Sequence, residues 1–244
     1  MKVLILGASG ATGTLVVSEL LKRKSTVRIV VREHAILAQA IKENPLVEIV
    51  RGNIDAFTQR RMEELLTDCD AAVCCLGHKT TMKGIFCKPH TLVFHAVQKI
   101  TAAMEIRAGS QKFILMSTTA YTNKATGEKN SVGEAILFSL LKVLLSPHRD
   151  NMLSADHLVH RIGKSEAFGW VAVRPDTLID EEQSSAYEAL EHTNRSPVFN
   201  AGKTSRINVA CFMADLVFDE VLWERWKYKT PVLYNKHRLK QSVV

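Results

Sequence analysis

Three evenly spaced glycines lie near the start of the chain, in the segment LILGASGATGTLVV. Gly7, Gly10 and Gly13 interrupt a run of aliphatic residues, and glycine allows a tight bend and a close approach to the main chain. Between a strand and a helix, such a turn directs free backbone N–H groups at an anion. We therefore expect a turn that binds a pyrophosphate, with a ligand-free tight turn as the alternative. Its expected members are Gly7, Ser9, Gly10, Ala11, Thr12 and Gly13.

A charged pair in the segment VVREH bears on which dinucleotide would bind. An acidic residue at the end of the second strand accepts hydrogen bonds from a ribose 2′-OH, whereas an arginine suits a 2′-phosphate. Arg32 occupies this place, and Glu33 is the competing candidate one residue later. The sequence favours NADP(H) over NAD(H), the alternative being a surface arginine in a loop.

The elements that must position these residues alternate along the first half of the chain. Short apolar runs alternate with amphipathic stretches, which is the pattern of βαβ units around a parallel sheet. Strands are expected at 3–6, 27–31, 47–50, 71–76, 113–116 and 170–173, and helices at 11–24, 34–43, 60–67, 91–107, 133–145 and 153–166. The prediction is an α/β fold, a Rossmann-type doubly wound parallel sheet.

The end of the chain has a different character. We expect residues 1–244 to form a single NAD(P)-binding Rossmann domain in which 176–244 contribute a small C-terminal substrate lobe. Asn208 is expected to cap a helix over 209–223, and 231–234 to return as a late strand. Loops at 78–89 and 122–130 follow predicted strands and are expected to hold substrate.

Composition limits the classes that remain. The 244 residues are 46% hydrophobic, enough for a substantial core. The net charge of +7 suits a polyanion or an anionic small molecule equally well, because the basic residues are spread along the chain apart from a C-terminal cluster. Five cysteines without a CxxC spacing indicate a reducing compartment, and no apolar run is long enough to span a bilayer. We expect a cytoplasmic protein without membrane association.

Several segments in order resemble one family. GNID at 52–55, CCLG at 74–77, MSTTAY at 116–121 and VAVRPDTL at 171–178 follow the expected third to sixth strands. With the glycine turn and Arg32, they resemble an atypical short-chain dehydrogenase/reductase over about residues 1–220. The chain is most similar to the NAD(P)H-binding group that includes NmrA-like proteins and the flavin reductase/biliverdin-IXβ reductase.

The resemblance implies a set of coenzyme contacts at strand ends. Asn53 and Ile54 would flank the adenine, and Pro175 would close the carboxamide side of the nicotinamide. Cys75, Leu76 and Gly77 would pass under the nicotinamide-side ribose, although Cys74 and Cys75 also read as buried strand residues, and 52–55 also reads as an ordinary turn.

The resemblance also implies where catalysis would take place. Ser117 to Thr119 would lie beside the nicotinamide, and Thr119 aligns with the family's hydroxyl residue there. Ser117 is its neighbour, and Tyr121 is a substitute phenolic donor. Hydrogen bonding at a strand end is the alternative role for these hydroxyls.

One departure from the family pattern limits the chemistry. Most short-chain dehydrogenases use a tyrosine and a lysine four residues apart, but the chain has no YxxxK, and Met152 and Asp156 stand near the expected positions. Two hypotheses follow. The chain is an NADPH-dependent oxidoreductase that passes hydride to a flavin, quinone or related conjugated acceptor, or it is a non-catalytic NADP(H)-binding redox sensor of NmrA-like type with a protein partner.

Two other features carry less weight. His157 and His160 share a helical face near Asp156 and His148, but the spacing lacks a convincing third and fourth ligand, so no metal site is expected. The C-terminal run of basic and aromatic residues is compatible with nucleic-acid binding. We expect instead that Trp223, Trp226 and Tyr228 pack on the sheet, leaving a solvated basic tail.

Overall fold

The first strand shows why the sheet is covered on both faces. In β1 (Lys2–Leu6), Val3 and Ile5 belong to one buried hydrophobic cluster, and Leu4 and Leu6 belong to the other. Successive side chains of a strand point to opposite faces, so a strand that is apolar throughout must lie between two layers of helices.

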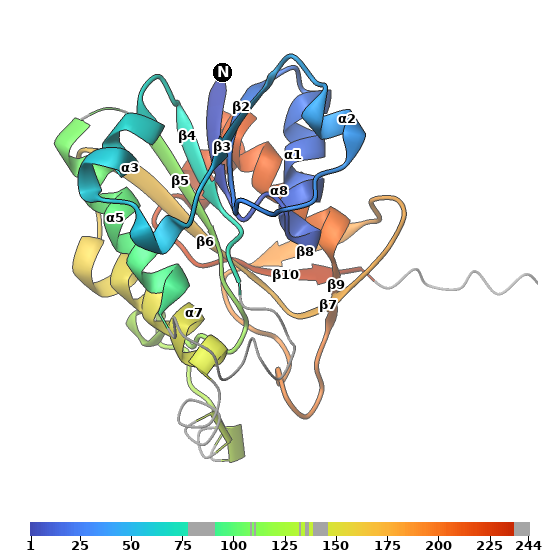
Figure 1. The fold of residues 1–244 in the computed structure, drawn as a ribbon. Helices are drawn as coiled ribbons and strands as arrows, with labels where there is room; N and C mark the ends of the chain where they lie inside the picture. Colours follow the sequence, from blue (N-terminus) through green and yellow to red (C-terminus); the bar gives the residue numbers. More distant parts are fainter. Residues whose placement is uncertain are drawn as a thin grey trace, which may run out of the picture.

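The computed structural model describes residues 1–77, 91–107, 109, 111–131, 133–134, 137–138 and 146–236. Within these residues, eight strands form one sheet in the order β3-β2-β1-β4-β5-β6-β10-β8 (Figure 1). Neighbours in it are parallel, except for the antiparallel pair β10 and β8. The other strands of the sheet are β2 (Thr26–Val31), β3 (Val47–Arg51), β4 (Ala71–Cys74), β5 (Gln111–Met116), β6 (Phe168–Pro175), β8 (Tyr187–Leu190) and β10 (Val232–Asn235).

Helices cover both faces of the sheet. On one face α1 (Ala11–Lys22) packs against α8 (Arg206–Phe218), and α9 (Glu220–Trp226) follows; on the other lie α3 (Gln59–Leu66) and α5 (Leu92–Arg107) (Figure 1). The other helical elements are α2 (Gln39–Lys42), η1 (Ile54–Ala56), η2 (Lys124–Thr126), α7 (Ser146–Asp156) and the π-helix η3 (His157–Ile162). This confirms the predicted Rossmann-type α/β fold.

The strand register brings the predicted site segments to one edge. Leu6 pairs with Val30 of β2 and with Cys74 of β4, and Cys74 pairs with Leu115 of β5. The segments that follow these strands therefore leave the sheet side by side at its carboxyl edge, where open α/β sheets bind ligands.

The segment after Pro175 is more closely joined to the sheet than a separate lobe would be. β10 and β8 extend the main sheet, while β7 (Thr177–Ile179) and β9 (Lys203–Ser205) pair in a small sheet of their own. β10 matches the late strand expected at 231–234. That 176–244 serves the substrate side remains a prediction.

Three helix predictions need correction. The helix expected over 209–223 is two helices, because the Asp219 carboxylate accepts the Leu222 amide at 2.9 Å and starts α9. Ser205 rather than Asn208 caps α8, with its hydroxyl oxygen 3.3 Å from the Asn208 amide. The helix expected over 34–43 shrinks to α2.

The third of these helices is the one expected over 153–166. It begins earlier, as α7, and continues as the π-helix η3. The loop expected at 78–89, most of the helix expected at 133–145 and the tail after Lys236 lie outside the described residues. No helix in the described ranges has both the length and the apolarity to cross a bilayer.

Candidate functional site

The glycine turn joins β1 to α1, and two of its glycines are required by backbone contacts. Gly7 has φ +82°, and a Cβ there would lie 2.6 Å from the carbonyl atoms of Cys75. A Cβ on Gly13 would lie 2.1 Å from the carbonyl oxygen of Gly7. The start of α1 is therefore pressed against the turn, and the turn against the end of β4.

Gly10 differs from the other two glycines. A Cβ on it would come within 3.2 Å of the Gly7 oxygen and would otherwise meet open space, and the residue is exposed. Its amide donates to Gly7 at 2.9 Å, but as the N-cap of α1 it has no side chain to accept from the helix.

The start of α1 therefore offers free donors. The amides of Ala11, Thr12 and Gly13 have no acceptor within the helix, as in the first turn of any α-helix. The first turn carries no acidic residue, and Ser9 and Ala11 are exposed beside it. Amides without helical partners at the positive end of a helix dipole form an anion site.

Arg32 follows β2 at the same edge of the sheet. Its side chain is exposed and makes no hydrogen bond or ion pair with the part of the chain that the structure describes. The Arg51 guanidinium donates to the Glu33 carbonyl at 2.6 Å and to the Arg32 carbonyl at 3.4 Å, so it holds the backbone of this turn. Arg32 is thus an unpaired cation on a fixed backbone.

The residues predicted near the adenine follow β3. Gly52 donates its amide to the Val31 carbonyl at 2.9 Å, which ties this turn to the end of β2. Asn53 is exposed and accepts the Asp55 amide at 3.3 Å, so it caps η1, while Ile54 is buried. This segment is therefore a capped turn that lies at the carboxyl edge of the sheet.

The segment after β4 presents backbone rather than thiols. Cys75 is buried, and its amide donates to Leu6 at 2.9 Å, whereas Leu76 is half-buried and Gly77 exposed. Burial raises the pKa of the Cys75 thiol, so it stays neutral. Any ligand contact here involves the main chain.

The three predicted hydroxyls differ in their surroundings. The Ser117 and Thr119 amides donate to the Val173 and Pro175 carbonyls, which ties the loop after β5 to buried β6. Ser117 Oγ is buried and has no hydrogen-bond partner among the described residues. Thr119 is 6% exposed and lines a cavity of about 240 Å³.

Tyr121 lies deeper. Its hydroxyl is fully buried and has no hydrogen-bond partner in the described ranges, and burial raises its pKa. Its carbonyl accepts from the Arg174 guanidinium at 2.8 Å, which fixes its backbone. The phenol therefore reaches an acceptor only if the side chain moves.

A buried ion pair beneath the cavity was not predicted from the sequence. Arg174 is fully buried and donates to both carboxylate oxygens of Glu128, at 2.7 and 2.9 Å. Burial is the largest single effect and opposes ionisation of Glu128, but the hydrogen bonds and charge of Arg174, together with hydrogen bonds from two backbone amides, outweigh it and lower the pKa of the carboxyl. The pair locks the 122–130 loop to β6.

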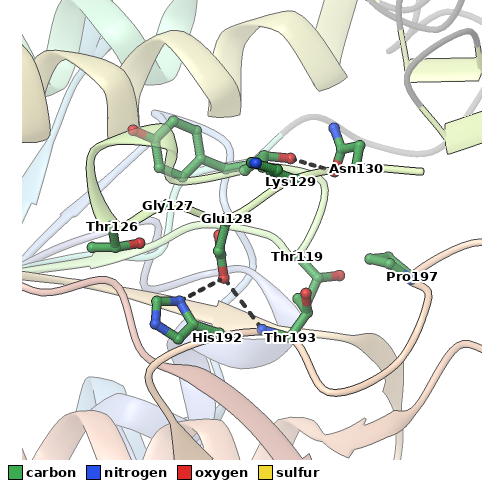
Figure 2. A pocket seen from close by; sticks show the side chains of 11 residues that line it. Thr119, Thr126, Gly127, Glu128, Lys129, Asn130, His192, Thr193 and Pro197 are labelled. Carbon is green, nitrogen blue, oxygen red and sulfur yellow. Dashed lines mark hydrogen bonds and ion pairs between the residues drawn. The ribbon is translucent and has the colours of Figure 1, made fainter. Parts of the chain in front are cut away.

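The cavity itself lies between this loop and the 192–197 segment. Figure 2 shows Thr119 opposite Pro197, and Glu128 joined to His192 and Thr193. His192 Nδ1 lies 3.5 Å from Glu128 Oε1, and the Thr193 amide donates to the same oxygen at 3.2 Å. The loop expected at 122–130 thus forms one wall of the cavity that Thr119 lines.

The positions where a tyrosine and lysine pair would be expected lie in α7. Met152 is half-buried and Asp156 is exposed, with His160 3.6 Å from its carboxylate. His157 Nε2 instead contacts the Thr101 hydroxyl at 3.3 Å. In the described ranges, no group of three or more histidine, cysteine or acidic side chains could hold a metal ion.

Comparison with known protein families shows the family to which the chain belongs. The model of a family described as NAD(P)H-binding matches residues 7–220. The chain belongs to this NAD(P)H-binding family. The match covers every segment on which the resemblance was based and confirms that resemblance.

Solved structures with the fold of this NAD(P)H-binding protein span nearly its whole length. A candidate NADH-flavin reductase from Streptococcus pneumoniae is 17% identical, with 97% of this chain and 100% of that chain covered and a TM-score of 0.69. A short-chain dehydrogenase/reductase from Veillonella parvula in complex with NADP is 15% identical, with 96% and 94% covered and a TM-score of 0.68. The anaerobilin reductase ChuY from Escherichia coli O157:H7 is 15% identical, with 98% of both chains covered and a TM-score of 0.66. At these identities the likeness establishes the shared fold.

A sequence relative covers less of the chain. An uncharacterized chloroplastic protein of Arabidopsis thaliana is 28% identical over 127 residues, which are 52% of this chain and 44% of that protein. The chain therefore spans less than half the length of this curated relative.

The donors at the carboxyl edge fit an NAD(P)H molecule. Free amides at the start of α1 suit a pyrophosphate, and the close contacts of Gly7 and Gly13 hold them in place. Arg32 supplies an unpaired cation one strand away. The individual contacts of Asn53, Ile54, Leu76, Gly77 and Pro175 remain predictions.

Proposed function

We propose that this protein is an NADPH-dependent oxidoreductase that transfers hydride to a flavin, a quinone or a related conjugated acceptor. The observation that carries the proposal is the uncapped start of α1, where Gly10 and Ala11 are exposed, with the unpaired Arg32 at the end of the neighbouring strand. A pyrophosphate would accept from the amides of Ala11, Thr12 and Gly13, and a 2′-phosphate would meet the guanidinium. This set of donors favours NADPH over NADH, because Arg32 would be left unpaired by a ribose 2′-OH.

The chain's own residues would then position the acceptor. When bound, NADPH supplies the hydride. Thr119 lines the cavity next to the end of β5, so its hydroxyl would orient an acceptor atom, with Ser117 behind it. The buried Arg174–Glu128 pair holds the cavity wall still, which keeps the reacting groups close. Tyr121 would act as a phenolic donor only after a side-chain movement.

The choice of a conjugated acceptor rests on the proton donors that the site contains. Met152 and Asp156 replace the usual tyrosine and lysine, so an alcohol or ketone would lack its usual proton donor. A conjugated acceptor delocalises the incoming electron pair, so its reduction depends less on a proton donor from the protein. The structural neighbours named for flavin and anaerobilin reduction support this acceptor class.

We propose that the protein acts in a reducing compartment, and the cytoplasm is the simplest such location. The described cysteines Cys69, Cys74, Cys75 and Cys211 are free thiols, which supports this proposal. We further propose that the segment 176–244 serves the substrate side and that neither a membrane nor nucleic acid is a partner.

An acceptor screen tests the proposed reaction. Oxidation of NADPH would be followed by absorbance with FMN, FAD, a quinone, a tetrapyrrole and an artificial dye. We expect turnover with at least one acceptor, faster with NADPH than with NADH. Tight NADPH binding without turnover on any acceptor would contradict the enzyme, and would favour a redox sensor that reports the coenzyme ratio to a protein partner.

A further inference from the structure

A second cavity is lined by residues other than the proposed coenzyme contacts. It has a volume of about 560 Å³ and is lined by residues from the ends of β7, β9 and β10, from the segment 181–185 and from the segment before β9. None of its lining residues belongs to the set proposed to hold NADP(H) or to act in catalysis. Its lining residues come from both strands of the small sheet and from the strand that extends the main sheet (Figure 1).

Three cations line this cavity without anionic partners. Arg195, Lys203 and Lys236 form no ion pair or side-chain hydrogen bond with the described part of the chain. Arg195 is half-buried, whereas Lys203 and Lys236 are exposed. Unpaired cations gathered around one concave site attract an anion.

The acidic group of the cavity is already engaged. Glu181 accepts from the Asn235 amide at 3.1 Å and from the Ser185 hydroxyl at 2.9 Å, both neutral donors. Three positive charges and one negative charge give the lining a net charge of +2, and the Asp176 carboxylate, which interacts electrostatically with Arg195, offsets one of these positive charges. A phosphate monoester carries about −1.5 to −2 at neutral pH, so its charge is opposite to that of the site.

The guanidinium is positioned by an aromatic ring. Arg195 Cζ lies 5.5 Å from the centre of the Tyr234 ring, a distance at which a cation is attracted to the ring face. Tyr234 is 2% exposed, and its hydroxyl proton has no acceptor among the described residues. As with Tyr121, this fully buried hydroxyl reaches a ligand oxygen only if the side chain moves, and it then gains a hydrogen bond.

Gly202 makes this arrangement possible. A Cβ there would lie 2.4 and 2.6 Å from two atoms of the Tyr234 ring, so only glycine allows the ring to lie against the backbone. The Gly202 amide donates to Asp176 at 2.9 Å, as does the Thr177 amide at 2.8 Å. Asp176 is therefore satisfied by amides, and it forms no ion pair with Arg195 within the described ranges.

We propose that this cavity binds a phosphate group of a small molecule, held by Arg195, Lys203 and Lys236 with the Tyr234 hydroxyl as an additional donor. A planar guanidinium and two ammonium groups are the side chains that bind phosphate most strongly. The site is separate from the coenzyme cradle and does not depend on the proposed reaction. The ligand is a phosphorylated substrate or effector.

The probe for the test is inorganic phosphate, titrated by calorimetry in the presence of saturating NADP⁺. We expect binding with a dissociation constant of about 1 mM or tighter. Arg195→Gln and Lys203→Gln should each weaken it about tenfold, the loss of one charge-assisted hydrogen bond. Lys164→Gln is the matched control, because this exposed lysine lies outside the cavity and its loss should change nothing.

A second variant tests the site with little effect on the fold. Tyr234→Phe removes only an unpartnered hydroxyl, so the fold should persist while phosphate binding weakens. Equal binding by the wild type and the Arg195, Lys203 and Tyr234 variants would overturn the inference. Phosphate binding that is lost in Arg32→Gln but kept in Arg195→Gln would place the ion in the coenzyme cradle and would overturn it as well.

Discussion

The position that a Cβ would take on Gly13 is 2.1 Å from the carbonyl oxygen of Gly7. No side chain fits there, so helix α1 begins in direct contact with the turn that precedes it. The amides of its first turn are therefore held at the carboxyl edge of the sheet, and their orientation does not depend on a ligand. This pre-organisation is the physical basis of the proposed coenzyme site.

Gly13→Ala should destabilise the fold, whereas Gly10→Ala should not. The first variant forces a methyl group onto a backbone oxygen, and we expect a loss of about 1–3 kcal/mol in the free energy of unfolding. In the second, φ is −82° and the new methyl group would lie 3.2 Å from the Gly7 oxygen, a contact that a small shift relieves, so stability should change by less than about 1 kcal/mol. Urea denaturation measures both. Equal midpoints for the wild type and Gly13→Ala would refute the close contact.

Arg32→Gln should discriminate between the two coenzymes. Loss of a charge-assisted contact to the 2′-phosphate should raise the dissociation constant of NADPH by about 10- to 100-fold and leave that of NADH nearly unchanged. Lys42→Gln removes an exposed charge on nearby α2 and should affect neither. Equal weakening of NADPH and NADH in Arg32→Gln would argue against a 2′-phosphate contact.

Thr119→Val should lower kcat by about tenfold without changing the affinity for NADPH, because the hydroxyl is proposed to orient the acceptor. Tyr121→Phe separates the roles of the two hydroxyls. The Tyr121 hydroxyl is buried and unpartnered among the described residues, so its removal should lower kcat less than Thr119→Val does. Steady-state kinetics with the best acceptor measures both variants. A lower kcat in Tyr121→Phe together with an unchanged kcat in Thr119→Val would contradict this assignment and would give the acceptor-orienting role to Tyr121.

Glu128→Gln should destabilise the protein by about 3–5 kcal/mol, because it leaves the charge of Arg174 buried without a counter-ion. Glu191→Gln breaks an exposed pair with Lys229 and should cost about 1 kcal/mol or less. Denaturant unfolding at neutral pH measures the two. Similar small losses would show that the buried pair contributes little.

The contribution of Glu128 should also depend on pH. Its folded pKa is lowered from the ordinary value of 4.5, so its stabilisation is fully present above that value. As the pH falls through the lower folded pKa, the carboxylate is protonated and this contribution is lost. The difference in unfolding free energy between the wild type and Glu128→Gln should therefore shrink below about pH 4.5. A difference that stays constant into this range would contradict the assignment.

Local features of the fold were predictable from the sequence. The glycine turn, the apolar strands and helix α5 depend on neighbouring residues, and the structure contains all of them. Strand β8 was missed because its four residues are all half-buried, so the sequence YEAL shows no alternation. The helix over 209–223 was predicted as one element because its apolar spacing continues through Asp219, whose capping bond is visible only in the structure.

The parts of the site that depend on distant residues were not predictable. Arg174 and Glu128 are 46 positions apart, and only the strand order brings them together. The 560 Å³ cavity likewise combines Arg195, Lys203 and Lys236 from separate elements. Pairing between distant charges leaves no periodic signal in a single sequence.

The most direct test of the account is an NADPH titration followed by nicotinamide fluorescence, with the wild type and Gly10→Asp side by side. The introduced carboxylate would cap α1, which should preserve or raise stability, and would repel a pyrophosphate. We predict saturable binding to the wild type and a loss of at least about 100-fold in Gly10→Asp, with a melting temperature no lower than that of the wild type. Equal NADPH affinity in the two proteins, or no saturable binding to the wild type, would contradict the coenzyme site.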